Sequence, residues 1–158
     1  MSVSPASSVP VDVSLEPSRY HHRHPVRVYW EDTDAGGIVF YANYLKFFER
    51  ARTEWLRALD LGQQQLREQT GGMFVVTDAR LRYLRPARLD DELIVTARLQ
   101  DSGRASMTIE QQAFLTTQAT PAQPQLLCEA SIRIGWVDGT SMRAARIPDS
   151  VLQAISRS

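Results

Sequence analysis

The sequence predicts an α+β fold in which a curved antiparallel sheet wraps around one long central helix. Residues 43–60 repeat apolar side chains at steps of three and four, whereas one stretch before them and four after them alternate apolar with polar side chains. One long helix between a first strand and four later strands is typical of an α+β order rather than of βαβα repetition. A length of 158 residues suits a single domain of this kind.

The first predicted strand carries its apolar side chains on one face. Val26, Val28 and Trp30 alternate with Arg27 and Tyr29, which predicts a short strand with one buried side. The segment EDTDAGGIVFYAN follows and has no regular period. Its two adjacent glycines permit backbone angles that are closed to other residues, so we expect an irregular loop.

The long helix is predicted from Asn43 to Asp60. Its apolar stripe consists of Tyr44, Phe48, Ala51, Trp55 and Leu59, widened by Leu45, Phe47 and Leu56. The opposite, polar face carries Lys46, Glu49, Arg50 and Arg57. Asn43 is expected to cap the start of this helix and Gly62 to end it. A short second helical piece is expected from Gln63 to Gln69.

Four strands are expected after the Gly71-Gly72 pair. The first places Val75, Ala79, Leu81 and Tyr83 on one face and Asp78, Arg80 and Arg82 on the other. The next three have apolar faces made by Leu93, Val95, Ala97 and Leu99, by Met107, Ile109, Ala113 and Leu115, and by Cys128, Ala130, Ile132, Ile134 and Trp136. A turn at residues 101–103 and an exposed hairpin loop at 116–125 connect these strands. Pro148 is expected to open a short final helix.

The composition excludes several classes of protein. Apolar residues make up 43% of the chain and charged residues 23%, and the formal net charge is zero. Such a chain lacks the positive field that carries nucleic-acid affinity, so no nucleic-acid partner is expected. No apolar run approaches about 18 residues, so neither membrane insertion nor a signal peptide is expected. Cys128 is the only cysteine, which fits a cytoplasmic protein without disulfide bonds.

Two regions are expected along the chain. Residues 1–22 are rich in Ser, Pro and Val without a usable period, and we expect them to form a flexible N-terminal extension. Residues 23–158 are expected to form the single folded domain, with ordered structure beginning near Pro25.

The acidic glycine loop has the groups that thioester hydrolysis requires. An oxygen nucleophile, or a base that activates water, must attack the carbonyl carbon, and hydrogen-bond donors must stabilise the charge that develops on the carbonyl oxygen. A carboxylate just before a helix provides the first. The unpaired N–H groups of the first helical turn, at the positive end of the helix dipole, provide the second.

The segment EDTDAGGIVFYANYLKFFERAR resembles the 4-hydroxybenzoyl-CoA thioesterase-like hotdog family, and within it the acyl-CoA thioesterases associated with the Tol-Pal cell-envelope system. The similarity continues in YLRPARLDDEL and VDGTSMRAARIP and covers roughly residues 25–150. It implies a hotdog fold and hydrolysis of a short-chain aliphatic or aromatic acyl-CoA to free acid and CoA, without a cofactor. It also implies a homodimer or homotetramer whose site forms where two subunits meet.

The resemblance also assigns site residues. The family's catalytic aspartate is the second of the D-x-D pair, here Asp34, which acts as nucleophile or general base. The family's carbonyl-polarising backbone N–H falls at Tyr41, where many Tol-Pal-associated members have histidine; a backbone donor does not depend on that side chain. Asp32 is expected to brace the loop. Substrate binding is implied at Gly37, Ile38, Val39 and Arg104.

Several other candidates have plainer explanations. Asp34 fits an aspartate turn beside two glycines, an explanation that the full motif outweighs. Glu49 is an alternative catalytic carboxylate, although the solvated face of the helix also explains it. Arginines at five positions suit either the phosphates of CoA or a solvated strand face, and the latter is favoured for each: Arg80, Arg82, Arg85, Arg88 and Arg104.

The remaining reactive or charged residues are expected to be structural. Ion pairs at the surface or at an interface are expected of Arg50, Arg52 and Glu54. No metal site is expected at His21, His22 and His24, because no cysteine or acidic residue lies at ligand spacing nearby. Cys128 is expected to be a buried, inert thiol. Phe48 and Trp55 are expected in the core, with an acyl pocket as the alternative.

Two other functions fit the same fold. A non-catalytic module that binds acyl-CoA or an acyl carrier protein, or serves as a scaffold, would keep the architecture without turnover. An acyl carrier protein is also the alternative carrier of a hydrolysed acyl group. A hotdog hydratase would need an Asp–His pair to activate water, and no histidine follows residue 24.

Overall fold

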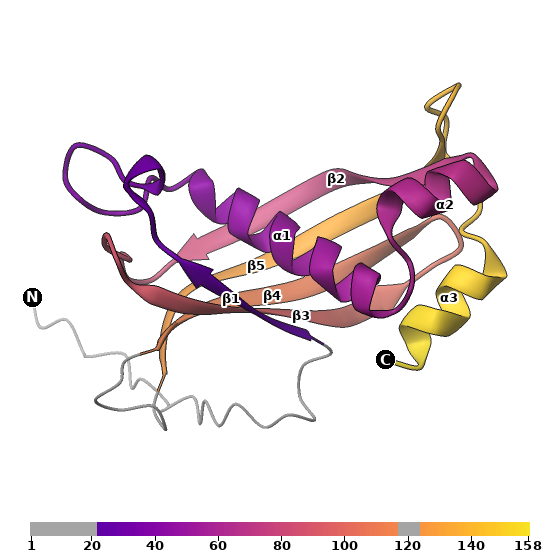
Figure 1. The fold of residues 1–158 in the computed structure, drawn as a ribbon. Coiled ribbons are helices and arrows are strands. Elements are labelled where there is room, and N and C mark those ends of the chain that lie inside the picture. The colour runs from indigo at the N-terminus through magenta and orange to yellow at the C-terminus, as the bar shows by residue number, and fades with distance from the viewer. Residues whose placement is uncertain (1–21, 117–123) are drawn as a thin grey trace, which may run out of the picture.

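The protein is a five-stranded antiparallel sheet with strand order β1-β3-β4-β5-β2, curved around one long helix (Figure 1). This computed structural model describes residues 22–116 and 124–158. The predicted α+β architecture is confirmed. The extension expected at residues 1–22 lies outside the described residues except for His22, as does most of the hairpin loop expected at 116–125.

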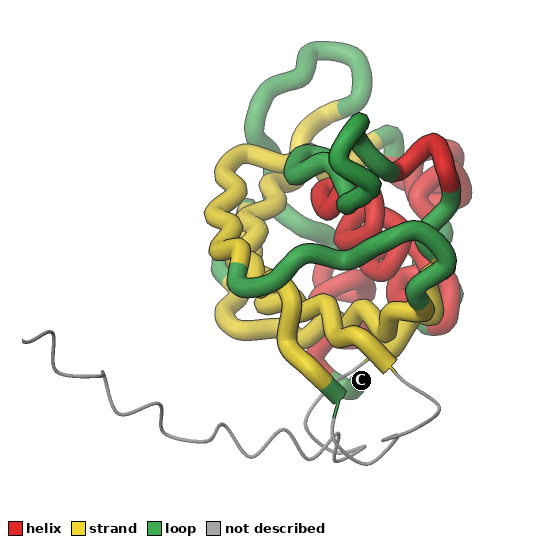
Figure 2. The backbone as a smooth tube through the Cα atoms, turned by 90° about the vertical axis from the view of Figure 1, so that its left-hand side faces the viewer, coloured by secondary structure: helices red, strands yellow, loops and turns green. Residues whose placement is uncertain are grey.

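The elements follow the order expected from the sequence. They are β1 (His22–Arg27), the 3-10 turn η2 (Trp30–Asp32), α1 (Asn43–Ala58), α2 (Gln63–Thr70), β2 (Gly72–Tyr83), β3 (Glu92–Ser102), β4 (Ser106–Thr116), β5 (Gln125–Asp138) and α3 (Asp149–Ser156). Seen from the end, the strands curve along two sides of the molecule and the helices fill the space that they enclose (Figure 2). No helix within residues 22–116 and 124–158 has the length and hydropathy to cross a membrane.

Helix α1 supplies one side of the core. Its buried apolar residues are Tyr44, Phe47, Phe48, Ala51, Trp55 and Leu56, which pack in one cluster with the inner faces of the strands. Three details of the prediction are wrong. Leu45 is 41% exposed and lies outside the apolar stripe. Ala42 is the N-cap, and Asn43 is the first helical residue. The helix ends at Ala58, and Gly62 is the N-cap of α2.

The first strand also differs from its prediction. It begins at His22 and ends at Arg27, and Val26 faces the core. Trp30 is 81% exposed rather than buried, because the chain leaves the strand and forms the 3-10 turn. Asp32 stabilises this turn by accepting a hydrogen bond from the Tyr29 N–H through Oδ2, at 2.8 Å.

The three strands β3, β4 and β5 bury the faces that their alternation predicts, with Leu99 and Leu115 only partly buried. By contrast, β2 lies at an edge of the sheet and pairs only with β5. Its register shifts between Val76 and Asp78, which interrupts the predicted alternation. Val76 is 51% exposed and Tyr83 is 46% exposed, so this strand leaves apolar surface in contact with solvent.

Candidate active site

The Asp32 carbonyl and the Asn43 side chain brace the acidic loop that connects η2 to α1. Asp32 is buried, and its backbone carbonyl accepts hydrogen bonds from the Phe40 N–H and from the Asn43 Nδ2, both at 2.9 Å. Asn43 therefore closes the loop on itself instead of capping the helix. These contacts use the backbone of Asp32, whereas its side chain acts in the preceding 3-10 turn, where Oδ2 accepts from the Tyr29 N–H at 2.8 Å.

Asp34 lies within the closed loop at an exposed position. Its Oδ1 accepts a hydrogen bond from the Gly36 N–H at 2.8 Å, and its own N–H donates to the Ile38 carbonyl at 2.8 Å. Gly37 donates to the Asp34 carbonyl at 3.0 Å and has a φ of +75°, which favours glycine. The turn thus holds one carboxylate oxygen, and Oδ2 makes no hydrogen bond to the described residues.

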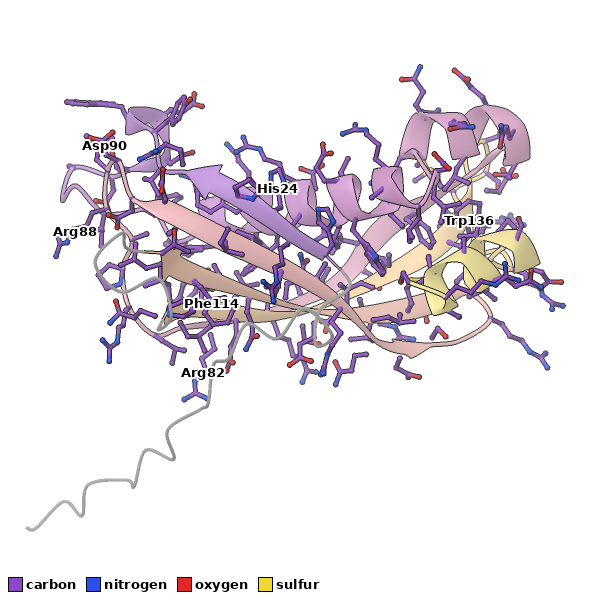
Figure 3. All side chains as sticks on the ribbon, turned by 60° about the horizontal axis from the view of Figure 1, so that its bottom comes forward. His24, Arg82, Arg88, Asp90, Phe114 and Trp136 are labelled. Atoms are coloured by element: carbon purple, nitrogen blue, oxygen red, sulfur yellow. The ribbon has the colours of Figure 1, made fainter. Side chains whose placement is uncertain are left out.

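The loop is attached to the connection between β2 and β3. Val39 donates to the Ala87 carbonyl at 2.9 Å, and Ile38 forms a β-bridge with Arg88. Figure 3 shows Arg88 and Asp90 of this connection at one end of the sheet, with Trp136 at the opposite end. Asp34 therefore lies at the end of the sheet where β2 finishes and β3 begins.

A hollow of about 230 Å³ opens beside this loop. It is lined by Ile38, Val39, Tyr41, Tyr44, Tyr83, Leu84, Arg85 and Pro86. The tyrosine rings contact one another edge to face: Tyr41 and Tyr83 have centroids 6.1 Å apart, and Tyr44 and Tyr83 have centroids 5.7 Å apart. The walls are thus largely apolar, and among the described residues that line the hollow only Arg85 is charged.

Tyr41 precedes α1 by two residues and is one of the residues that line the hollow. The carbonyl of Phe40 accepts from the Asn43 N–H at 2.8 Å, and the carbonyl of Tyr41 accepts from the Tyr83 hydroxyl at 2.9 Å. No acceptor among residues 22–116 and 124–158 is bonded to the Tyr41 N–H. Within the described residues this N–H is therefore unpaired, at the position that the resemblance assigns to the carbonyl-polarising donor.

The structure gathers most of the predicted site residues and separates one of them. Ile38 and Val39 line the hollow, and Gly37 lies in the adjoining turn. Arg104 occupies the turn between β3 and β4, at the far end of the 11-residue strand β3. A strand of that length spans roughly 35 Å, so Arg104 and Asp34 of one chain cannot contact the same small acyl group.

The other arginines and the alternative carboxylate lie mostly in solvent. Glu49 is exposed on the polar face of α1. Arg80 pairs with Asp78 at 3.4 Å, and Arg82 pairs with Glu129 at 3.6 Å. Arg82 points away from the helices on the outer face of the sheet (Figure 3). These contacts fit the solvated strand face that was favoured for both arginines.

The histidines and the cysteine form no reactive centre in the described part of the chain. His22 and His24 have stacked rings with centroids 6.4 Å apart, and partial burial lowers the pKa of each. No group of three or more His, Cys, Asp and Glu side chains is placed to hold a metal ion within the described residues. Cys128 is fully buried, and burial raises the pKa of its thiol to about 12, as expected of an inert cysteine.

One buried polar pair was missed in the sequence. Arg52 of α1 is 8% exposed rather than at the surface, and its Nη1 donates to Oε1 of the fully buried Gln111 at 2.8 Å. The Gln111 Nε2 donates to the carbonyls of Phe48 at 3.0 Å and Thr96 at 3.2 Å. Burial lowers the pKa of Arg52 to about 10. Gln111 interrupts the apolar face of β4, and this polar residue in an apolar series was the sequence signal for a buried polar contact.

Comparison with known proteins identifies relatives of this chain. Residues 28–155 match the family model described as the thioesterase-like superfamily. The acyl-CoA thioesterase YbgC of Haemophilus influenzae is 41% identical over 130 residues, covering 82% of this chain and 90% of that protein. The acyl-CoA thioester hydrolase YbgC of Escherichia coli O6:H1 is 39% identical over 130 residues, covering 82% of this chain and 92% of that protein.

Solved structures share the fold. A probable thioesterase from Bartonella henselae is 30% identical with a TM-score of 0.71, covering 80% of this chain and 98% of its own. A 4-hydroxybenzoyl-CoA thioesterase mutant complexed with 4-hydroxybenzoyl-CoA has a TM-score of 0.77 at 20% identity, covering 84% of this chain and 96% of its own. The second similarity concerns the fold alone.

Proposed function

This chain belongs to the thioesterase-like superfamily and is an acyl-CoA thioesterase, and we propose that Asp34 is the carboxylate with which it cleaves its substrate. The observation that supports the proposal is that Asp34 and the unpaired Tyr41 N–H belong to one loop, residues 33–42, which contributes to the wall of the apolar hollow. A nucleophile or base and an oxyanion donor are the two components that acyl transfer requires.

The proposed reaction uses Oδ2 of Asp34, because Oδ1 already accepts from the Gly36 N–H. Either Oδ2 attacks the thioester carbon directly, or it removes a proton from a water molecule that attacks the same carbon. The carbonyl π electrons move to oxygen, where the Tyr41 N–H and the helix dipole stabilise the negative charge. Collapse of this intermediate breaks the C–S bond, and the CoA thiolate leaves and takes up a proton. After direct attack, water hydrolyses the resulting anhydride and restores the Asp34 carboxylate.

The hollow is the proposed acyl site. Its volume of about 230 Å³ and its apolar, tyrosine-rich wall suit a short aliphatic chain or one aromatic ring rather than a long fatty chain. Ile38 and Val39 would contact the acyl group, and Gly37 would let the backbone approach the thioester. The carrier is proposed to be CoA, with an acyl carrier protein as the alternative. Hydrolysis needs only water besides these groups, so we propose no cofactor and no metal.

A second copy of the chain would bring a distant arginine to the site. Among residues 22–116 and 124–158, β2 pairs with a strand on one side only. If the other edges of two copies pair antiparallel, the end of one β2 lies beside the start of the other. The turn that carries Arg104 lies at the end of the sheet opposite Asp34, so this pairing brings the partner's end of the sheet to the acidic loop. We propose that Arg104 contacts the CoA phosphates of a substrate held by the other subunit.

The test is thiol release from a panel of short aliphatic, long aliphatic and aromatic acyl-CoAs and the corresponding acyl carrier protein thioesters. Wild type is compared with Asp34→Asn, which keeps the shape of the side chain and removes its charge. Asp60→Asn is the matched control, because Asp60 is an exposed aspartate between α1 and α2 with a φ of +58° that asparagine tolerates. We expect Asp34→Asn to lower kcat by roughly a hundredfold or more, and Asp60→Asn to behave as wild type.

Each other outcome has a definite meaning. If Asp34→Asn retains full activity, Asp34 is not the catalytic carboxylate and Glu49 is tested next. If wild type hydrolyses none of the thioesters yet binds acyl-CoA tightly, the chain is a non-catalytic acyl-binding module. Asp34 would then serve only its turn, in which Oδ1 already bonds the Gly36 N–H.

A further inference from the structure

Tyr44 contacts both the hollow and the core of the protein. It lines the hollow, where its ring packs edge to face against the ring of Tyr83 with centroids 5.7 Å apart. The same ring packs edge to face against Phe47, with centroids 5.8 Å apart, and Phe47 is fully buried. Tyr44 itself is only 3% exposed. One buried ring therefore adjoins the wall of the hollow and the interior.

The ring of Tyr44 is held at both ends. Its backbone belongs to α1, of which it is the second residue. Its hydroxyl accepts a hydrogen bond from the N–H of the fully buried Ala87 at 3.3 Å. Ala87 is held in turn, because its carbonyl accepts from the Val39 N–H at 2.9 Å. The ring cannot turn aside without leaving a buried N–H unpaired, which is unfavourable.

Most of the other residues around the hollow lie at its rim. Tyr41, Tyr83 and Leu84 are 63%, 46% and 40% exposed. Among the described residues that line the hollow, only Val39 and Tyr44 are buried. Because tyrosine is much larger than valine, Tyr44 is the largest buried side chain of this wall. Its replacement by a smaller residue should therefore enlarge the hollow on its inner side, since the surrounding structure relaxes only partly.

We propose that the Tyr44 ring closes the inner end of the hollow and sets the longest acyl chain that the site accepts. This inference rests on the proposed function, because it assigns the hollow to the acyl group. The interior beyond the ring is close-packed, so an acyl chain that reaches Tyr44 cannot extend further while the ring is present. One methylene group in an apolar pocket changes kcat/KM by roughly 10- to 200-fold, so one ring at the end of the pocket can separate short chains from long ones.

The variant that tests this role is Tyr44→Leu, which removes the ring and keeps an apolar side chain. The kcat/KM values for butanoyl-, hexanoyl-, octanoyl- and decanoyl-CoA are measured for wild type and variant. We expect wild type to lose activity as the chain lengthens. In Tyr44→Leu the ratio of kcat/KM for octanoyl-CoA to that for butanoyl-CoA should rise by roughly tenfold or more. Tyr44→Phe keeps the ring and should keep the wild-type ratio.

Phe48→Leu is the matched control. Phe48 and Trp55 are the buried residues of α1 for which the sequence left an acyl pocket as the alternative, but neither is among the residues that line the hollow. Phe48 lies about one helical turn after Tyr44, so its replacement loosens the same part of the core and leaves the wall of the hollow in place. Urea denaturation should show that both leucine variants are folded and destabilised. Only Tyr44→Leu should change the chain-length ratio.

The chain-length limit and the proposed function fail in different ways. If wild type turns over and Tyr44→Leu keeps the wild-type ratio, Tyr44 does not set the limit while the thioesterase assignment stands. If Phe48→Leu raises the ratio equally, a loosened core explains the change, which also overturns the inference. If Tyr44→Leu does not fold, Tyr44→Met takes its place with the same expected rise, because the flexible methionine side chain adapts to irregular space.

A binding measurement keeps the inference testable without turnover. If wild type hydrolyses no thioester, the proposed function fails, and butyl- and octyl-CoA thioethers replace the substrates. Tighter binding of the octyl thioether to Tyr44→Leu than to wild type, with butyl thioether affinity unchanged, would still support the length limit. Equal affinities of the two proteins for the octyl thioether would contradict it.

Discussion

At the start of β2, Gly72 lies directly against the indole of Trp136. A Cβ atom added to Gly72 would lie 2.3 Å from the indole ring, closer than side-chain carbons approach, whereas one added to Gly103 would be 3.6 Å from its nearest neighbour. Trp136 cannot easily move away, because it is 3% exposed and packs edge to face on Phe74 with centroids 4.9 Å apart. The close approach of strand and ring therefore requires glycine at this position.

We expect Gly72→Ala to lower the free energy of unfolding by about 1–3 kcal/mol, because the added methyl group overpacks a filled region. Gly103→Ala, in the open turn between β3 and β4, should change it by less than about 1 kcal/mol. Urea denaturation of both variants measures the difference. Equal free energies of unfolding would show that the Trp136 indole moves aside without loss of stability.

Cys128 provides a second test at the residue scale. Burial raises the pKa of its thiol from 9.0 to about 12, so the folded protein holds the thiol proton at a pH where the unfolded chain has lost it. This contribution to stability is complete below pH 9 and is lost as the pH rises toward 12. We expect a thiol reagent at pH 8 to label the native protein far more slowly than the urea-unfolded chain. Equal labelling rates would contradict the buried assignment.

At the scale of elements, Arg52 and Gln111 connect α1 to the middle of the sheet. The guanidinium donates to Gln111, which in turn donates to the helix at Phe48 and to β3 at Thr96. A buried charge is costly unless its hydrogen bonds are made, so each partner depends on the other.

We expect Gln111→Leu to destabilise the fold by about 2–4 kcal/mol, because Arg52 stays buried without its acceptor. Arg52→Met should cost about 1–3 kcal/mol by leaving the Gln111 oxygen unsatisfied. The double variant should lose clearly less than the sum of the two single losses, since it removes both polar groups. Urea denaturation of all four proteins measures this coupling, and simple additivity would show that the pair is not a unit.

The alternation of residues predicted β3, β4 and β5 because each of these strands buries one continuous face. It misplaced Trp30 because a period of two also occurs by chance where the chain has already left the sheet. The helical pattern of residues 43–60 did not reveal that Arg52 is buried, because its acceptor, Gln111, belongs to β4 and lies 59 positions away. Elements follow from local pattern, whereas contacts between distant elements do not.

The same distinction between local patterns and distant contacts applies to the candidate site. Asp34 and Tyr41 could be named as candidates because the family resemblance rests on one short continuous motif that contains both, and their catalytic roles stay predictions. The contact of Tyr83 with Tyr41 was not predictable, because it joins an edge strand to a loop 42 positions away. The distance of Arg104 from Asp34 likewise depends on the length and direction of β3.

At the scale of the whole molecule, the exposed edge of β2 is the feature that most needs a partner. Strand β2 has 12 residues, exposes apolar side chains such as Val76 and Tyr83, and has no partner on its outer side in the described part of the chain. Such an edge is prone to pairing with another chain. Antiparallel self-pairing would satisfy its free backbone groups and would cover these side chains. We therefore expect light scattering to give twice or four times the chain mass of 17.9 kDa. A mass of one chain would contradict an assembly.

The same edge links assembly to activity. A two-fold antiparallel pairing brings residues near the middle of the strand close to their own copies, so Val76→Arg, near the middle of β2, places like charges across the interface without entering the core. We expect this variant to be folded and monomeric. Its kcat/KM should fall at least tenfold, because no second subunit then brings its Arg104 to the CoA phosphates. Gln153→Arg adds the same charge on the exposed side of α3 and should keep both assembly and activity. A fully active Val76→Arg monomer would show that one chain contains the complete site and that Arg104 is not part of it.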